Sequence, residues 1–264
     1  TNVNVDDKLK VLYDRLNVEY VKIYSNLTRW QKVELARHND RPHTSDYINY
    51  ITDDWIEIHG DRRFSDDPSL ICGFATINQM SCVIIGNEKG RGTKDKLYRN
   101  FGMAKPEGYR KALRIMKLAE KFNIPIITFI DTPGAYPGIG AEERGQAQAI
   151  ADNLFHMSTL TVPILSIVIG EGASGGALAI GLADKIYCLE NTWYSVISPE
   201  GCASILFHDT TKAKDAANSM KVSSDDLYEM GIADGIITEP LGGAHNNYKE
   251  MSSIVKSFIL EQIK

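Results

Sequence analysis

The chain has 264 residues, of which 43% are hydrophobic and 24% charged, and its formal net charge is −5. A chain of this length buries most of its apolar surface in one large domain, and its acidic balance argues against a nucleic acid or an anionic membrane as partner. Its four cysteines form no C-x-x-C pair, which argues against a disulfide framework or a zinc site and favours a reducing cytoplasm. We expect no membrane-spanning helix or signal peptide in this sequence, because no apolar run reaches about 18 residues.

The first 60 residues are predicted to form a helical extension, followed by a larger domain over residues 61–264. Apolar residues recur every three or four positions between residues 7 and 37, which fits one long amphipathic helix or two shorter ones. Thr44 or Ser45 would cap a further helix, with Tyr47, Trp55 and Ile58 on one face. The extension either packs on its own domain or contacts another subunit, and the sequence leaves both roles open.

A hairpin is expected next, because LICGFATI (70–77) and MSCVIIG (80–86) are separated by two turn residues. The loop over residues 87–94 carries Lys89, Arg91 and Lys94. It is either a solvated surface loop or a contact for an anion, such as the phosphates of a coenzyme or an acidic partner.

Two strand–loop–helix units follow in the middle of the chain. After a helix over 106–122, the first unit has strand 124–130, loop 131–140 and helix 141–160. The second has the β-branched strand 162–169, the glycine-rich turn GEGASGG (170–176) and a helix that contains ALAIGLA. Consecutive units of this kind have parallel strands, so both loops should meet at the carboxyl edge of the sheet, where α/β folds bind ligands.

The last third of the chain is predicted to alternate short strands and helices. A proline-opened helix should start at Ser198-Pro199, because proline is tolerated in the first helical turn. The other expected elements are strands over 185–189, 194–197 and 235–238, acidic helices around 215–220 and 225–230, and a helix over 247–264.

The glycine-rich turn could bind a dinucleotide, or it could carry a nucleophilic serine. Gly170-x-Gly172-x-x-Gly175 matches the dinucleotide-binding fingerprint, with Glu190 placed to take the ribose hydroxyls. This motif lies deep in the chain, however, and opens only a short helix. Ser174 would be a nucleophile only with a histidine base, and neither His156 nor His208 has a spacing that supports one, so a helix N-cap suits Ser174 better.

A third interpretation uses only the main chain. Gly175 and Gly176 would leave two N–H groups uncovered at the positive end of a helix, where they can bond an oxygen as negative charge develops on it. Removing one such donor typically costs about 2.7–4 kcal/mol of transition-state stabilisation. The alternative is that the glycines only allow the helix and strand to pack closely, and the spacing does not decide between the two.

Four sequence blocks are similar to those of a known family. RNFGMAKPEGYRKALRIMKLAEKFNIPIITFIDTPGAYPGIGAEERGQAQAIA (99–151), VIGEGASGGALAIG (168–181), YSVISPEGCASIL (194–206) and EPLGGAH (239–245) resemble the carboxyltransferase alpha subunit of bacterial acetyl-coenzyme A carboxylase. The resemblance covers nearly the whole chain from His59 onward, and only loosely the segment before it. Ala173 departs from the pattern, because the family usually carries glycine there.

The resemblance implies a fold, a reaction and partners. The fold would be α/β, a crotonase-like superhelix of strand–strand–helix units. The reaction would transfer the carboxyl group of carboxybiotin, held on a separate biotin carboxyl carrier protein, to acetyl-coenzyme A, which gives malonyl-coenzyme A for fatty acid synthesis. The chain would pair with a beta subunit as an α2β2 assembly with the active site between the subunits, and biotin carboxylase would belong to the wider complex. A zinc ribbon would lie in the beta subunit, and no metal in this chain.

The resemblance also assigns roles to residues. Gly175 and Gly176 would hold the ureido oxygen of biotin, and a glycine pair on the partner would hold the thioester oxygen of acetyl-coenzyme A. Breakdown of carboxybiotin to carbon dioxide and a biotin enolate would supply the base, so no protein base is needed. Further residues would line the biotin side of the pocket: Gly134, Tyr136, Gly138, Ile139, Gly140, Gly172, Ser198 and Pro199.

Three other functions remain to be compared with this one. A free-standing crotonase-like hydratase, isomerase or decarboxylase of acyl-coenzyme A would need an acid or base, for which Glu142, Glu143 and Glu171 are the candidates. A dinucleotide-dependent oxidoreductase would use the glycine fingerprint, and a non-catalytic scaffold would only bind partners. Valine at Gly175 or Gly176 is expected to abolish carboxyl transfer and leave the fold intact.

Overall fold

The structure is a computed structural model and describes residues 5–263. Its centre is an eight-stranded sheet in the order β1-β2-β3-β4-β5-β6-β8, and β7 pairs with β5 beyond this path. The strands are β1 (Asp54–Glu57), β2 (Leu70–Ile77), β3 (Met80–Asn87), β4 (Ile126–Thr132), β5 (Ile164–Ala173), β6 (Lys185–Leu189), β7 (Trp193–Ser195) and β8 (Gly235–Ile237). From β3 to β8 all neighbouring strands are parallel, and β1 and β2 add an antiparallel edge.

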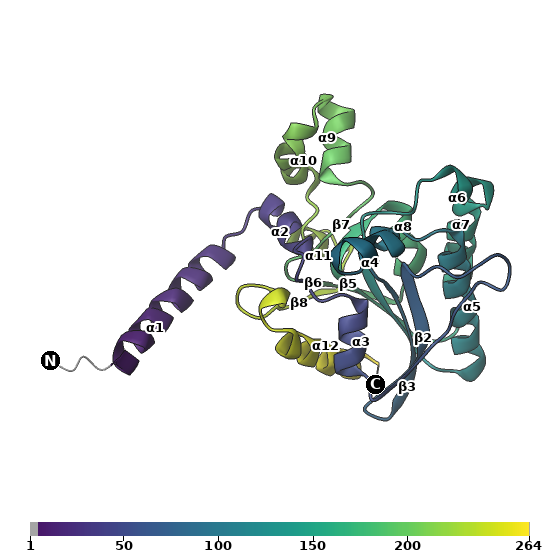
Figure 1. The fold of residues 1–264 in the computed structure, drawn as a ribbon, viewed down its shortest axis with the longest axis horizontal. Helices are drawn as coiled ribbons and strands as arrows, with labels where there is room; N and C mark the ends of the chain where they lie inside the picture. The colour runs from purple at the N-terminus through teal and green to yellow at the C-terminus, as the bar shows by residue number, and fades with distance from the viewer. Residues whose placement is uncertain (1–4, 264) are drawn as a thin grey trace.

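Helices cover both faces of this sheet (Figure 1). One face packs against α5, α7 and α8, and the other against α3 and α12. The helices are α1 (Val5–Tyr24), α2 (Arg29–Ala36), α3 (Thr44–Ile51), α4 (Gly92–Tyr98), α5 (Pro106–Phe122), α6 (Ile139–Glu143), α7 (Gln146–Met157), α8 (Ser174–Gly181), α9 (Pro199–Phe207), α10 (Ala213–Met220), α11 (Ser224–Glu229) and α12 (Tyr248–Gln262). No helix among residues 5–263 is both long and apolar enough to cross a bilayer.

The two-sided burial follows from the alternation of side chains along the central strands. Ile126 and Ile130 of β4 belong to the core under α5 and α7, whereas Ile127 and Phe129 belong to the core under α3 and α12. Strands β4 and β5 are buried along their whole length. The predicted near-continuous apolar runs are thus those of strands covered on both faces.

Several local predictions are confirmed. The 70–77 and 80–86 strands form the β2–β3 hairpin, with Asn78 and Gln79 at φ 48° and 71° in the left-handed turn that matches strand twist. Helix α5 has the predicted limits, with proline in its first turn. The segment between residues 7 and 37 contains two helices, α1 and α2, and in Figure 1 α1 extends away from the rest of the molecule.

Two other predictions about helix limits were wrong. The helix predicted to include Trp55 and Ile58 ends at Ile51, since residues 54–57 pair antiparallel with β2 as an edge strand. The helix predicted over 141–160 is divided by Gly145, at φ 81°, into α6 and α7. The division of the chain at residue 60 stays a prediction.

The glycine-rich turn predicted over 170–176 was also wrong in part. Residues 170–173 continue strand β5, because Gly172 and Ala173 pair with Tyr194 and Ser195 of β7. Helix α8 then begins at Ser174 with no intervening loop. The change from strand to helix therefore takes place at a single residue.

Candidate active site

The junction of β5 and α8 lies directly against the loop that follows β4. A Cβ atom added to Gly176 would lie 2.3 Å from the carbonyl carbon of Gly134 and 2.5 Å from the nitrogen of Ala135. The Gly134 peptide is itself held by Thr132, whose hydroxyl donates to the Gly134 carbonyl (2.7 Å) and accepts from its N–H (3.1 Å). The two predicted loops therefore meet, backbone against backbone, and Gly176 is required by this packing.

Gly175 differs from its neighbour. A Cβ added there would lie 3.4 Å from the Cδ1 atom of Ile150, an ordinary contact, so packing alone does not demand glycine. The N–H group of Gly175 stands in the first turn of α8, where N–H groups have no acceptor within the helix. Packing therefore explains the glycine at position 176 but not the one at position 175, and a role as oxyanion donor stays a prediction for both N–H groups.

A pocket of about 480 Å³ opens in front of Gly175. One wall comes from α8, a second from β7 and the residue after it, and a third from α10, α11 and the segments that follow them. Its lining residues are Ser174, Gly175, Leu178, Tyr194, Ser195, Val196, Met220, Lys221, Val222, Leu227, Met230 and Ile232. This combination of apolar walls and few polar groups suits a flat, mostly apolar ligand that carries a polar oxygen.

Sequence reasoning missed the third wall. The segment around α10 and α11 was predicted only as acidic helices, yet Met220, Met230 and Ile232 lie in or just after these helices and line the pocket. Apolar residues within an otherwise acidic segment were the available signal. They could not be assigned to a pocket without knowing that these helices lie beside α8.

Tyr194 explains why Gly172 has no side chain. A Cβ on Gly172 would lie 2.3 Å from the Tyr194 ring, and a Cβ on Gly170 would lie 2.2 Å from the carboxylate of Asp131. Burial raises the pKa of Tyr194 to about 12, so its hydroxyl is neutral at physiological pH. These glycines accommodate neighbouring side chains within a strand, and the dinucleotide interpretation was wrong because there is no turn for a pyrophosphate to approach.

The structure does not support Ser174 as a cap or a nucleophile. The residue before α8 is Ala173, without a side-chain cap bond, so the predicted N-cap was wrong. Ser174 is exposed and has a left-handed backbone with φ 56°. Among residues 5–263 no histidine forms a hydrogen bond with it, whereas a nucleophilic serine needs such a base.

Most of the other predicted pocket residues lie outside this pocket. Tyr136 packs against the Lys105 ammonium, 5.2 Å from its ring centroid, and the ring also fills the space beside Gly138. Ile139 is exposed at the start of α6, with Gly140 next to it. Their contact with biotin stays a prediction, and it is the Gly134–Ala135 peptide of this loop that lies against the start of α8.

Ser198 and Pro199 begin helix α9, as predicted. The Ser198 hydroxyl accepts the N–H of Gly201 (3.1 Å), and Pro199 occupies the first helical position. Neither residue lines the pocket in front of Gly175, although Val196, two residues before Ser198, does. Their direct contact with a ligand stays a prediction.

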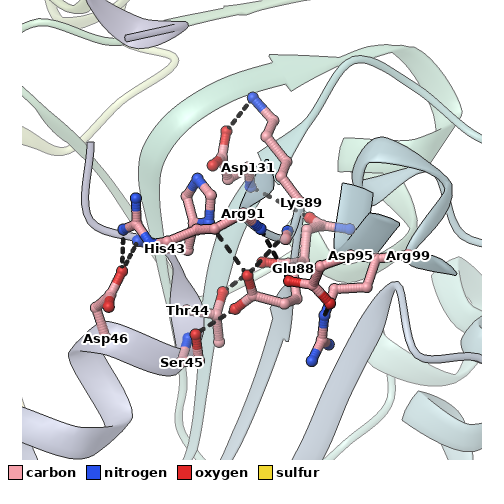
Figure 2. A network of polar contacts seen from close by, with 12 residues as sticks. His43, Thr44, Ser45, Asp46, Glu88, Lys89, Arg91, Asp95, Arg99 and Asp131 are labelled. Carbon is pink, nitrogen blue, oxygen red and sulfur yellow. Dashed lines mark hydrogen bonds and ion pairs between the residues drawn. The ribbon is translucent and has the colours of Figure 1, made fainter. Parts of the chain in front are cut away.

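Two of the three basic residues in the 87–94 loop already have carboxylate partners (Figure 2). The ammonium of Lys89 lies 2.7 Å from Asp131 and 2.6 Å from Glu171, and the guanidinium of Arg91 lies 2.6 Å from Asp46. Internal carboxylates therefore already pair with both cations, and contact of Lys89 and Arg91 with an external anion stays a prediction. Lys94 is exposed at the start of α4, and its role stays a prediction.

Glu171 is not a free acid or base. Burial alone would raise its pKa, but Lys89 and Arg37 outweigh burial and hold the pKa below its usual range. The carboxylate is therefore ionised and fully engaged, while Glu142 and Glu143 are exposed on α6. Within residues 5–263 no three His, Cys, Asp or Glu side chains come together as metal ligands.

Similar proteins agree with the resemblance seen in the sequence. The chain is 56% identical over 248 residues to the acetyl-coenzyme A carboxylase carboxyl transferase subunit alpha of Chlorobium limicola, which covers 92% of this chain and 74% of the relative. The subunits of the same name from Fusobacterium nucleatum (53% identical, 99% and 83% covered) and Staphylococcus haemolyticus (54% identical, 100% and 84% covered) are similar over the whole chain.

Solved structures with low sequence identity share the fold, and the predicted crotonase-like class is confirmed. A transcarboxylase 12S structure has a TM-score of 0.66 at 21% identity, with 85% of this chain and 42% of that chain covered. The beta subunit of P. aeruginosa geranyl-CoA carboxylase has a TM-score of 0.65 at 16% identity, with 90% and 45% covered. This chain thus spans less than half the length of those chains. The acetyl co-enzyme A carboxylase carboxyltransferase-like family matches residues 1–264, and the chain belongs to this family.

Proposed function

We propose that this chain is the alpha-type subunit of an acetyl-coenzyme A carboxylase carboxyltransferase, in which the Gly175 N–H stabilises negative charge on the ureido oxygen of carboxybiotin. Carboxybiotin, on its carrier protein, supplies the carboxyl group that acetyl-coenzyme A accepts to give malonyl-coenzyme A for fatty acid synthesis. The observation that carries this proposal is a glycine in the first turn of α8 that packing does not require and that lines a pocket of about 480 Å³.

The chemistry of the pocket fits charge stabilisation better than acid–base catalysis. Its lining residues include no carboxylate and no histidine, and their two titratable side chains are Tyr194 and Lys221. The Tyr194 hydroxyl is neutral, since burial raises its pKa to about 12. A main-chain donor that is held in place needs no reorganisation as charge develops, which is the advantage of an oxyanion hole.

The surface around the pocket suits a second subunit. Leu178, Val196 and Met230 line the pocket and remain 41%, 82% and 49% exposed. A beta subunit packed over this rim, in an α2β2 assembly, would bury these side chains and bring the donors for the thioester oxygen of acetyl-coenzyme A. The carrier protein would deliver biotin to the same opening, and biotin carboxylase would complete the complex. We place this reaction in the cytoplasm, in line with four cysteines that are all unpaired and buried.

A pair of variants at one position tests the donor. Gly175→Pro removes the N–H in the first turn of α8, although proline disfavours the left-handed backbone of Ser174 before it, whereas Gly175→Ala keeps the N–H and fits beside Ile150. With the beta subunit present, malonyl-coenzyme A-dependent carboxylation of biocytin should fall about 10²–10³-fold in the proline variant. The alanine variant should stay within a few-fold of the wild type.

Circular dichroism and thermal unfolding of both variants establish that the proline variant is folded. A folded proline variant with wild-type activity would overturn the assignment of Gly175. Valine at Gly176, expected from the sequence to leave the fold intact, is unsuitable, because its Cβ would lie 2.3 Å from the Gly134 carbonyl carbon. Turnover of acyl-coenzyme A by the isolated chain would favour a free-standing crotonase-like enzyme instead.

A further inference from the structure

Helix α2, from the N-terminal extension, lies against the end of strand β5. Val33 and Ala36 of this helix pack with Ala173, the last residue of β5, and with Trp193 of β7. Arg37 follows directly at the end of α2. The extension thus reaches the backbone segment that leads into the candidate oxyanion site.

The guanidinium of Arg37 joins three elements around that site. Its Nε lies 2.5 Å from Glu171 in β5, and its two terminal nitrogens lie 2.6 Å and 3.2 Å from the carboxylate oxygens of Glu200 in the first turn of α9. The same group lies over the Trp193 ring, 5.5 Å from its centroid. A planar guanidinium can bond two carboxylates at once in fixed directions, which an ammonium cannot do.

Glu171 and Glu200, the two carboxylate partners of Arg37, are close in sequence to residues that line the pocket. Glu171 lies four residues before Gly175, and Glu200 lies four residues after Val196, and both Gly175 and Val196 line the pocket. One side chain outside the pocket therefore connects the strand that leads into the candidate donor to the segment that follows the β7 wall.

We infer that Arg37 is a positioning residue for carboxyl transfer, setting the distance between the Gly175 N–H and the pocket wall formed by β7 and Val196, the segment that leads into α9. This inference rests on the proposed function. It also gives the N-terminal extension a role in the reaction, since α2 supplies the side chain that draws Glu171 and Glu200 together.

Removing the Arg37 side chain should leave the fold intact but allow the pocket wall formed by β7 and Val196 to move. Glu171 would keep Lys89 as its partner at 2.6 Å, and Lys89 also holds Asp131 at the end of β4. The Glu200 carboxylate, in contrast, would lose the Arg37 cation that pairs with it. Because displacements near 1 Å can cost about 10²-fold in rate, a shift of α9 that moves Val196 and the β7 wall with it is enough to affect transfer.

The test compares Arg37→Met with Arg99→Met in the complex with the beta subunit. Arg99 is a matched control, since it bonds Asp95 (3.0 Å) and the Pro68 carbonyl (2.8 Å) and contacts no pocket residue by these bonds. In carboxylation of biocytin from malonyl-coenzyme A, Arg37→Met should lower kcat/KM for biocytin by about 10–10²-fold. The KM for malonyl-coenzyme A should stay unchanged, and Arg99→Met should match the wild type.

Chemical rescue separates positioning from general stability. Millimolar guanidinium should restore part of the activity of Arg37→Ala, whereas it should not restore Gly175→Pro. Unchanged biocytin kinetics in Arg37→Met would overturn the inference, as would a loss that affects both substrates equally and resists rescue. Failure of the wild-type complex to carboxylate biocytin would instead refute the proposed function, so the two failures are distinguishable.

Discussion

The buried pair of Arg41 and Glu239 allows a quantitative prediction about stability. The side chains are 1% and 0% exposed, and the pair is bidentate, with one of the two bonds at 3.1 Å. Arg41 also donates to the carbonyl of Ile169 in β5 (2.6 Å), and Glu239 accepts N–H groups from Asn191 (3.0 Å) and Ala244 (2.8 Å). Glu239→Gln removes the negative charge and keeps the size of the side chain, so a buried cation remains without its counter-charge.

Removing one partner of a buried ion pair costs about 3–5 kcal/mol. At about 2–4 °C of Tm per kcal/mol, Glu239→Gln should lower the Tm by roughly 6–20 °C. Urea unfolding followed by circular dichroism measures the free energy directly. The double variant Arg41→Met with Glu239→Met should be more stable than Glu239→Gln, because no isolated charge is left. A loss below about 1 kcal/mol in Glu239→Gln would refute this reasoning.

The same pair predicts a pH dependence. Burial would raise the pKa of Glu239, but Arg41 outweighs burial and holds that pKa below its usual 4.5. The folded-state pKa is therefore lower than the unfolded one, so this contribution to stability is present above pH 4.5 and is lost as the pH falls through the folded-state pKa. The difference in unfolding free energy between wild type and Glu239→Gln should shrink over that acidic range.

Three further predictions concern single residues. Gly176→Ala should lose about 1–3 kcal/mol of stability because its Cβ meets the Gly134 backbone, whereas Gly175→Ala should lose less than about 1 kcal/mol in the same urea titration. Ser174→Gly should raise the urea midpoint by the equivalent of up to about 1 kcal/mol, because glycine adopts the left-handed backbone at φ 56° without the strain that serine has there. A lowered midpoint would contradict this. Burial opposes ionisation of Glu88, but bonds from His43 and the Ser45 N–H lower its pKa to about 2. Between pH 4.5 and pH 2 the free energy of unfolding should therefore fall by about 3 kcal/mol more in the wild type than in Glu88→Gln. Equal losses in the two proteins would contradict this.

Elements set by neighbouring residues could be predicted from the sequence. The β2–β3 hairpin has its turn residues between two apolar strands, and α5 has proline at its start, so each prediction needed only local rules. Strand β1 and the end of β5 could not be predicted in this way. Their conformation depends on pairing with β2 and β7, which no pattern within the segments themselves indicates.

The candidate glycines could be named from the sequence, but their surroundings could be predicted only in part. The resemblance pointed to Gly175 and Gly176 together, but the Cβ contact with Gly134 was needed to show that packing explains only Gly176. Lys89 shows that the composition of a loop does not reveal the partner of a charged side chain. A lysine in a basic loop suggests contact with an external anion. Its partners Asp131 and Glu171 lie in strands far along the chain, so only the fold could show that the charge is already paired.

The arrangement of these contacts explains how a single main-chain donor can be held rigidly. The start of α8 rests on the Gly134 peptide, a contact between two backbones in which no side chain can change rotamer. Strand β5, which leads into it, is bonded by Arg41 at Ile169 and by Arg37 at Glu171. Both arginines come from the segment between α2 and α3, so the N-terminal extension supports the strand that leads into the proposed donor. Because preorganised donors act without rearrangement, a site built in this way needs no catalytic side chain of its own.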